Sequence, residues 1–400
     1  MTTAELTYNP YAYEIHEDPY PTYVRLRGEA PVYRNDAANF WALSRHADVM
    51  EAFRDSTRFS SGHGVSLDPA ASGPHAHKTM SFLAMDPPMH GRMRGLVSRG
   101  FTPRRVTELE PRIRELAGRY LDEAVEARSF DFIGALAGRL PMDVISELIG
   151  VPEVDRAEVR RLSDLLVHRE EGMDDVPPAG VEAAFRLITY YSDMLAQRRA
   201  KRTDDLTSAL LDAELDGDRL TDDEIMGFLF LMVVAGNETT TKLLGNAVYW
   251  AWQNPEERAK PLADRAAVPA WVEETLRYDT STQMLARVTT APVELHGTTI
   301  DAGERVVLLV GSANRDERVF ARPDRFDLER SPAEMQHIAS FGFGRHFCLG
   351  ASLARLEARI CLEELVARVA DYDIDPDGIR RVHSVNVRGF AALPITVRAR

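Results

Sequence analysis

The middle of this 400-residue chain carries one helical pattern after another, with no linker-like segment between them. Apolar residues recur at three- and four-residue spacing over Thr107–Ala127, Pro152–Val167, Val181–Arg199 and Thr221–Trp252. The last pattern begins at a capping box, because Glu224 stands three residues after Thr221. Strand-like segments are shorter and fewer: Phe40–Leu43, Val293–Leu295, Thr299–Ile300, Arg305–Val310 and Ile395–Val397. The sequence predicts a mainly α protein with small β-sheets, of the α+β class.

Charge and composition exclude several kinds of partner. Acidic residues outnumber basic ones by 62 to 48, so we expect the surface to repel nucleic acid and anionic lipid. The longest apolar run, Gly227 to Ala235, is far shorter than the roughly 20 residues that span a bilayer. The N-terminus has neither the basic start nor the apolar stretch of a signal peptide, and two cysteines suit a reducing compartment. We expect a cytoplasmic protein. Only four lysines are present, which we attribute to genome composition.

Two segments follow neither the helical nor the strand pattern. Ser60–Met85 is rich in Gly, Pro, Ser and His and is longer than most connections, so it is predicted to be a functional lid. His168–Gly180 is acidic and holds two prolines between helical patterns. Either segment could also be a solvated loop.

Cys348 lies in a glycine-rich segment, Phe341–Gly350, directly before a strong helical pattern. The glycines let the backbone fold tightly around the sulfur, and a helix start together with Arg345 and His346 favours a thiolate. The residues alone leave three uses open: a nucleophile, the single protein ligand of a metal cofactor, or a small buried hydrophobe. Cys361, in the middle of the helical pattern, is predicted to be buried and inert.

Four motifs in order resemble those of one family. Phe341–Gly350 is similar to Phe-x-x-Gly-x-[Arg/His]-x-Cys-x-Gly, the haem loop of the cytochrome P-450 monooxygenases, at every required position. Glu274–Arg277 resembles the family's Glu-x-x-Arg motif, and Ala235–Thr240 resembles its oxygen-activation motif. Met85–Arg94 is similar to a bacterial segment with His and Arg four residues apart. The resemblance extends over nearly the whole chain.

The resemblance implies a role for each motif. Cys348 would be the axial ligand of the iron of haem b. His90, Arg94, Arg287 and His346 would bind the haem propionates. Further haem contacts would come from Ala235, Gly236, Phe341 and Gly350. The long helix would open locally at its glycine, and Glu238 and Thr239 would relay protons. Glu274 and Arg277 would support the haem pocket structurally, through the loop around Arg322–Phe326.

The same resemblance places the substrate against apolar segments. The expected lining residues are Phe82, Leu83, Leu231, Val234, Gln283, Met284, Leu285 and Phe390. Few of them are charged, which suits a neutral, mostly apolar molecule. Thr280–Gln283 departs from many bacterial relatives, which have a proline in this stretch, so the contacts there are less securely transferred.

Electrons must come from another protein, because the chain has no flavin motif and too few cysteines for an iron–sulfur cluster. The resemblance to soluble bacterial members implies a ferredoxin and its reductase. A basic docking patch could be formed by Arg99, Arg104, Arg105, Arg345, Arg355 and Arg359. Some of these arginines could instead form salt bridges within the fold.

The sequence therefore predicts a single haem-binding monooxygenase domain, residues 1–400, with the haem between the long central helix and the helix after Cys348. It would be a bacterial-type enzyme, in the manner of those of secondary metabolism, and would hydroxylate or epoxidise a small apolar molecule with one atom of O2. Alternatives are oxidative coupling, desaturation, peroxide-driven oxidation, a non-catalytic haem binder or, on Cys348 alone, a hydrolase. Steroids, terpenes, fatty acids, polyketide rings and aromatic compounds all remain open as substrates.

Overall fold

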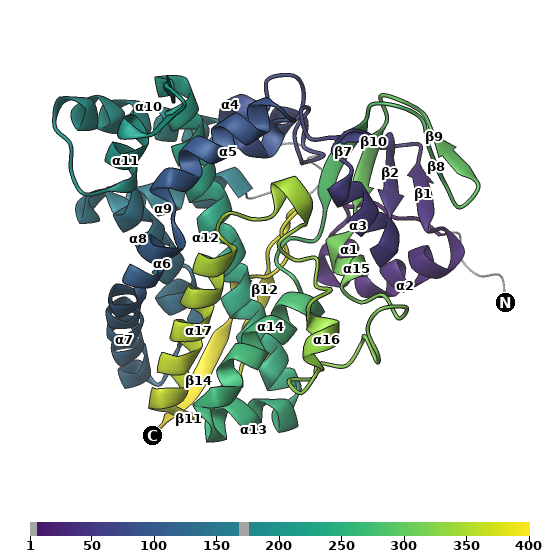
Figure 1. Cartoon of the computed structure of the whole chain (residues 1–400). Coiled ribbons are helices and arrows are strands. Elements are labelled where there is room, and N and C mark those ends of the chain that lie inside the picture. The colour runs from purple at the N-terminus through teal and green to yellow at the C-terminus, as the bar shows by residue number, and fades with distance from the viewer. Residues whose placement is uncertain (1–5, 168–175) are drawn as a thin grey trace.

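The computed structural model describes residues 6–167 and 176–400, and α12 (Asp222–Gln253) runs through its middle (Figure 1). The capping box predicted at its start is present, because Thr221 and Glu224 bond reciprocally to each other's backbone N–H. Around it pack α8 (Leu140–Ile149), α9 (Glu153–Val167), α10 (Pro178–Ala200), α14 (Val268–Tyr278) and α17 (Ala351–Arg368). α12 is therefore the element around which the helical half is built.

Further helices cover this half. They are α5 (Met89–Gly100), α6 (Pro103–Glu108), α7 (Glu110–Ala127), α11 (Leu206–Asp212) and α13 (Pro255–Ala263). The sequence predicted a single helix over 107–127, whereas the structure divides it at Leu109. Pro111, in the first turn of α7, cannot donate a backbone hydrogen bond to the preceding turn, so a new helix begins there.

The main sheet lies on the other side of the molecule, to the right in Figure 1. Its strands, in order, are β1 (Val32–Asn35), β2 (Phe40–Leu43), β10 (Arg305–Leu308), β7 (Leu285–Thr289) and β3 (Phe59–Ser60). All neighbours are antiparallel except β2 and β10. Helices α2 (Tyr20–Glu29), α3 (His46–Arg54) and α15 (Val310–Ala313) accompany the sheet. Because α15 begins at Val310, the predicted strand over 305–310 ends early, at Leu308.

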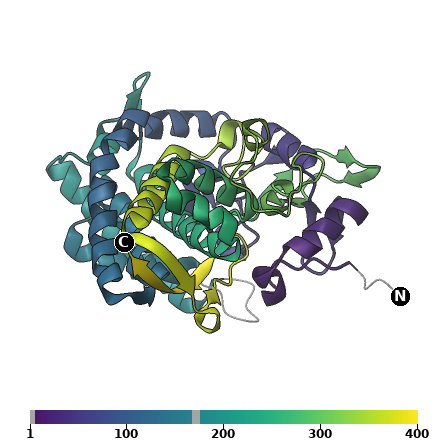
Figure 2. The ribbon, with the colours of Figure 1, turned by 90° about the horizontal axis from the view of Figure 1, so that it is seen from below.

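Smaller β elements close the lower and outer edges. β11 (Val369–Ile374), β14 (Pro394–Ala399) and β4 (Ser129–Asp131) form one sheet, seen from below in Figure 2. Two-stranded pairs are β12 (Arg380–Arg381) with β13 (Phe390–Ala392), β5 (Glu214–Leu215) with β6 (Asp218–Arg219), and β8 (Val293–Leu295) with β9 (Thr298–Ile300). His296 and Gly297, both with positive φ, form the predicted turn of the last pair. The mainly α class with small sheets is confirmed.

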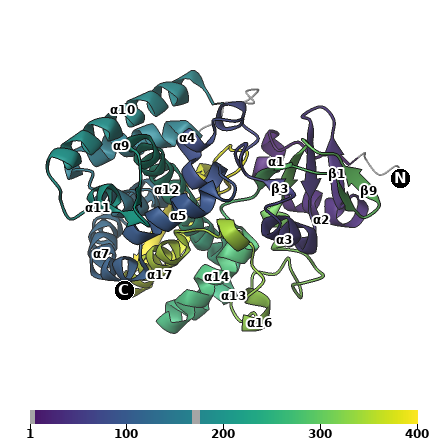
Figure 3. The ribbon, with the colours of Figure 1, turned by 45° about the horizontal axis from the view of Figure 1, so that its top comes forward.

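Segment 60–85 holds more structure than its composition suggested. It contains a 3-10 turn (Pro69–Ala71), α4 (His77–Met80) and a second 3-10 turn (Ser81–Ala84), and Val65, Leu67 and Phe82 are buried. Figure 3 shows α4 and α5 between the helical half and the sheet. The other predicted loop, 168–180, lies outside the described residues as far as Asp175, and α10 begins at Pro178.

The largest hydrophobic cluster surrounds α12 and includes Phe228, Trp271 and Cys361, all fully buried. Cys361 is thus a core residue, as predicted. Among the described residues, no helix is long and apolar enough to cross a membrane.

Candidate active site

The loop that carries Cys348 is shaped by its glycines. Gly342 and Gly344 both have positive φ, and the backbone N–H of Cys348 donates to the carbonyl of Phe341 at 2.9 Å. A Cβ on Gly344 would lie 3.1 Å from the carbonyl oxygen of Phe53. The turn therefore requires glycine both for its conformation and for its close approach to α3. It delivers Cys348 to the start of α17, with Gly350 as the N-cap.

The surroundings of the Cys348 sulfur pull its pKa in two directions. The residue has accessible surface, yet protein surrounds it on most sides, and this burial raises the pKa of the thiol. The backbone N–H groups of Gly350 and Ala351 and the charges of Arg94 and Arg355 lower it. The predicted helix-start donors are therefore present, but burial outweighs them. A cation bound directly to the sulfur would favour the thiolate.

Four basic side chains from three elements gather beside this loop. His90 and Arg94 come from α5, Arg287 from β7, and His346 from the loop itself. The rings of His90 and His346 lie 4.2 Å apart between centroids. Arg94 donates to the carbonyls of Arg345 and Phe347, at 3.2 and 2.7 Å, and so ties α5 to the loop. These four residues are called the basic cluster below.

Within the described residues the basic cluster forms no ion pair, and the charge of Asp86 is the anionic influence on Arg287 and His90. Nε2 of His90 and both ring nitrogens of His346 are buried without a hydrogen-bond partner there. Arg287 is 3% exposed, and within the described residues its guanidinium donates one hydrogen bond, to the carbonyl of its neighbour Ala286. Burial lowers the pKa of Arg287 to about 10. Burial, then Arg287, His90 and Arg94, lower the pKa of His346 to about 3.

Buried donors of this kind require acceptors, and a buried cation favours a buried anion. The two carboxylates of a haem would satisfy this donor set, with the porphyrin reaching from the basic cluster toward Cys348. The residues present therefore fit the cofactor that the sequence motifs imply.

The long helix α12 does not open at Gly236, although the family resemblance implied that it would. Ala235 is exposed and Thr239, one turn later, is half-buried. The hydroxyl of Thr239 donates to the carbonyl of Ala235 at 2.8 Å. The predicted local opening of the helix is wrong for this structure, because α12 is helical throughout Asp222–Gln253. A Cβ on Gly236 would meet only Ile145 side-chain atoms, at 3.6 Å, so packing does not demand glycine there.

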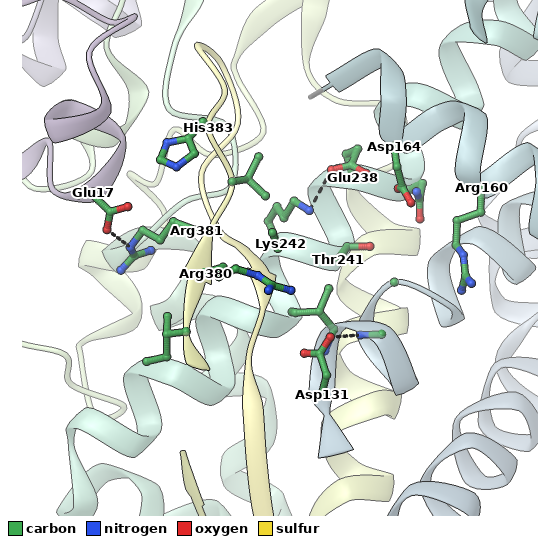
Figure 4. A pocket seen from close by; sticks show the side chains of 17 residues that line it. Glu17, Asp131, Arg160, Asp164, Glu238, Thr241, Lys242, Arg380, Arg381 and His383 are labelled. Atoms are coloured by element: carbon green, nitrogen blue, oxygen red, sulfur yellow. Dashed lines mark hydrogen bonds and ion pairs between the residues drawn. The ribbon is translucent and has the colours of Figure 1, made fainter. Parts of the chain in front are cut away.

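Glu238 occupies a different face of α12 from Thr239. It is 3% exposed and forms an ion pair with Lys242, Oε2 to Nζ, at 3.0 Å. Both line a pocket of about 670 Å³ on the flank of α12, called the flank pocket below (Figure 4). Its charged lining residues include Asp164, Glu238, Lys242, Arg160, Asp131 and Arg381. Although they are sequence neighbours, Glu238 lines the flank pocket, whereas Thr239 lies on the helix face that includes Ala235.

Glu274 and Arg277 form a closed network of buried charges. They lie three residues apart on α14 and make two hydrogen bonds, at 2.7 and 2.8 Å, with both side chains at most 1% exposed. Arg277 also donates to the carbonyls of Asn314, Pro323 and Arg325. Glu274 in turn accepts from Arg330 and from the backbone N–H of Asp327. This set, called the Glu274 network below, joins α14 to the loop at 322–326.

Comparison with known proteins places these features in a family. The sequence model of the cytochrome P-450 family matches residues 258–370. A protein named cytochrome P-450 123, from Mycobacterium tuberculosis, is 58% identical over 99% of this chain and 98% of its own length. The chain belongs to the cytochrome P-450 family. It is accordingly an oxidoreductase of the monooxygenase type, and its family uses haem b as the cofactor.

Two solved P-450 structures share the fold. CYP109Q5 from Chondromyces apiculatus is 36% identical, with a TM-score of 0.87 and 98% of each chain covered. CYP109E1 from Bacillus megaterium, solved in complex with corticosterone, is 33% identical, with a TM-score of 0.84 and coverage of 96% of this chain and 99% of that one. The predicted fold class and family are confirmed.

The predicted substrate-lining residues of this P-450 fall into three groups. Phe82 and Leu231 belong to the cluster around α12, Leu83 packs against it, and Val234 is half-buried on α12. Phe82 also lies beside the basic cluster, with its ring 6.0 Å from that of His90. These four residues remain consistent with a substrate site beside Ala235 and Thr239.

Three other assignments require correction. Gln283 is buried and donates its side-chain amide to the carbonyl of Thr280 at 2.8 Å, and Met284 accepts a contact from the hydroxyl of Tyr8. Phe390 packs against the ring of Tyr249, 4.8 Å away, and beneath Arg381. The side chains of Gln283 and Met284 bond to other parts of the fold, and Phe390 packs against α12 at Gly245 and Tyr249, further along the helix than Ala235 and Thr239. Leu285, on β7, is half-buried and packs with the cluster of the main sheet.

The six arginines of the predicted docking patch differ in whether they form ion pairs within the fold. Arg104 pairs with Glu108, Arg355 with Glu273, and Arg359 with Glu110 and Glu363. Within the described residues, Arg99, Arg105 and Arg345 form no ion pair. Only these last three remain for a partner.

Sequence reasoning missed the flank pocket. The sequence does contain one indication of it: Lys242 stands four residues after Glu238 on the predicted helix, a spacing that favours an ion pair. Asp164 lies on α9, 74 positions from Glu238, and no local pattern brings them together. Glu357 on α17 was also missed: it is 3% exposed, and burial raises the pKa of its carboxyl well above the usual range.

Proposed function

We propose that residues 1–400 act as one haem-thiolate monooxygenase unit that inserts one atom of O2 into a neutral, mostly apolar small molecule. The observation that carries this proposal is the basic cluster beside Cys348, whose buried nitrogens lack partners within the described residues. Buried cations that outnumber the nearby anions and form no direct ion pair are typical of a site for an anionic ligand. Membership of the family makes haem b the ligand that fits.

In this proposal, the sulfur of Cys348 would hold the haem iron, and His90, Arg94, Arg287 and His346 would hold the propionates. Phe341 and Gly350 of the loop, and Ala235 and Gly236 of α12, would contact the porphyrin. When bound, haem with an axial thiolate supplies O2 activation with cleavage of the O–O bond. Arg94 has a second role, since its hydrogen bonds to the loop hold Cys348 in position relative to α5.

Thr239 and Glu238 are proposed to deliver protons. The Thr239 hydroxyl, on the accessible face of α12, can pass a proton onward when it exchanges its bond to the Ala235 carbonyl. Glu238 must first leave Lys242, because its carboxylate is held in the flank pocket. A rotation of the Glu238 side chain about its own bonds brings the carboxyl toward Thr239 without moving the helix.

The proposed substrate site is formed by Phe82, Leu83, Leu231 and Val234, which offer apolar surface and no charge. The relative CYP109E1 has been solved with corticosterone bound, so steroids are the first class to test. Addition of steroids should shift the Soret band of the haem-loaded protein. Turnover under ¹⁸O2 should then place one labelled oxygen in the product.

The matched control for turnover is Thr239→Ala. This variant should bind the same steroids, consume reductant and release peroxide in place of product. Product without ¹⁸O from the gas, or a Thr239→Ala enzyme with wild-type coupling, would contradict the proposed function.

We also propose that a ferredoxin, with its reductase, supplies electrons in the cytoplasm. Arg345 belongs to the Cys348 loop, Arg99 to α5, which Arg94 ties to that loop, and Arg105 to α6, which contacts α17. Within the described residues these three cations form no ion pair. An acidic ferredoxin would complement them, so the rate of reduction should fall as ionic strength rises. A rate independent of salt would contradict this docking surface.

A further inference from the structure

The flank pocket contains two carboxyl groups that share one hydrogen bond. Asp164 on α9 and Glu238 on α12 point toward each other, as Figure 4 shows, and their carboxyls are hydrogen-bonded. Two carboxylates cannot both ionise at this separation without strong repulsion, so one of them holds a proton.

The two carboxyls differ in their access to water. Glu238 is buried at the base of the flank pocket, whereas Asp164 is accessible within it. The pocket volume of about 670 Å³ is large enough for several water molecules. Asn237 Oδ1, which is buried and lacks a hydrogen-bond partner within the described residues, adds a polar atom to the pocket wall. A proton can therefore reach Asp164 from solvent without crossing the substrate face of α12.

The charges around the pair favour the proton on Asp164. Enclosure by protein, then the charge of Glu238 and the hydrogen bond to it, raise the pKa of Asp164 to about 7. Lys242 and Arg160 oppose this rise. Lys242 contacts Glu238 directly at 3.0 Å and so stabilises its anionic form. Other charged groups facing the pocket are Asp131 of β4, Arg380 and Arg381 of β12, His383 after β12, and Glu17 at the end of α1 (Tyr13–Glu17).

We propose that Asp164 is the proton donor to Glu238, and that this transfer releases Glu238 from Lys242 toward Thr239. The proton moves along the existing hydrogen bond, from the carboxylic acid of Asp164 to the carboxylate of Glu238. Asp164 becomes an anion and takes its next proton from water in the flank pocket. Neutral Glu238 no longer forms an ion pair with Lys242, so the contact that holds it in the pocket is weakened.

This inference rests on the proposed role of Glu238 and Thr239, and it adds a dependence on pH. Below about pH 7 Asp164 carries its proton, and above this value it loses it. Coupling of electron consumption to product should therefore fall as pH rises through 7. If the role of Asp164 were purely structural, coupling would not depend on pH in this range.

The test uses haem-loaded wild type, Asp164→Asn and Asp164→Glu, with Glu17→Gln as the control. Glu17 lines the same pocket, but its side chain is 58% exposed and pairs with Arg381. Asp164→Asn should form product about tenfold more slowly, because an amide cannot donate this proton. Its coupling of electron consumption to product should no longer fall as pH rises through 7 (the pH limb of the wild type). Asp164→Glu should restore the limb, and Glu17→Gln should behave as wild type.

A second measurement does not depend on turnover. Infrared difference titration of the haem-loaded wild type should show a protonated carboxyl that disappears with a midpoint near pH 7 and is absent from Asp164→Asn. If Asp164→Asn keeps the band, or keeps wild-type coupling and pH limb while Thr239→Ala is uncoupled, the inference is overturned and the proposed function stands. If Thr239→Ala is itself fully coupled, the relay and this inference both fail.

Discussion

The structure contains two groups of buried charges, the Glu274 network and the basic cluster, and they differ in whether protein groups satisfy them. In the Glu274 network every charge meets a protein partner: Arg277 bonds to Glu274 and to three carbonyls, and Glu274 also accepts from Arg330 and a backbone N–H. In the basic cluster, Arg287 is buried and His346 is half-buried, and neither forms an ion pair among the described residues, although the charge of Asp86 reaches Arg287.

The difference separates scaffold from binding site. A charge network that is satisfied by the protein stabilises the fold by itself, whereas buried donors without acceptors destabilise the free protein and bind an anion. The same sequence signal, an arginine at a family position, therefore has two physical meanings. Opposite effects on the stability of the haem-free protein should distinguish them.

The largest effect is expected from Arg277→Leu. It leaves Glu274 as a buried carboxylate without its main partner, which costs about 3–5 kcal/mol of unfolding free energy. Denaturant unfolding of the haem-free protein measures this loss. The control is Glu29→Gln, which breaks the solvent-exposed Arg25–Glu29 pair and should leave the free energy of unfolding nearly unchanged. Equal effects of the two variants would show that the Glu274 network is not the structural support inferred here.

Arg287→Leu should act in the opposite direction. It removes a buried charge that has no ion pair within the described residues, so the haem-free protein should become more stable by about 1–2 kcal/mol. The same change should speed haem loss about tenfold or more, because a charge-assisted bond to a propionate disappears. Transfer of haem to an acceptor globin measures the second effect. A variant that is less stable without haem and retains haem normally would place Arg287 with the scaffold.

A third, smaller effect is expected at Glu357, a buried carboxyl whose Oε2 has no hydrogen-bond partner within the described residues. Burial raises its folded-state pKa above the unfolded value, so the folded protein binds more protons above about pH 4.5. Its contribution to stability therefore declines as pH rises from that value toward the folded pKa. Glu357→Gln should flatten this decline and be about 1–2 kcal/mol more stable than wild type at pH 8. Unfolding at pH 5 and pH 8 checks it, and an unchanged slope would contradict it.

Some of these features could be predicted from the sequence, and others could not. The Glu274–Arg277 pair was readable because residues three apart on a helix share a face. The division of 107–127 at Leu109 was also readable, from Pro111, but the apolar periodicity outweighed it. Gln283, Met284 and Phe390 were misplaced because a motif gives the position of a segment and not the direction of each side chain. The contact of Asp164 with Glu238 depends on how α9 packs against α12, which no local pattern encodes.

The central claim is that Cys348 provides the thiolate of a haem enzyme, and the carbon monoxide difference spectrum of the reduced protein tests it most directly. Wild type should give the thiolate-type Soret band, and Arg287→Leu should give the same band at lower haem occupancy. Cys348→Ser should lose it even when haem is bound. A wild-type protein that binds haem without this band, or a Cys348→Ser variant that retains it, would contradict the account.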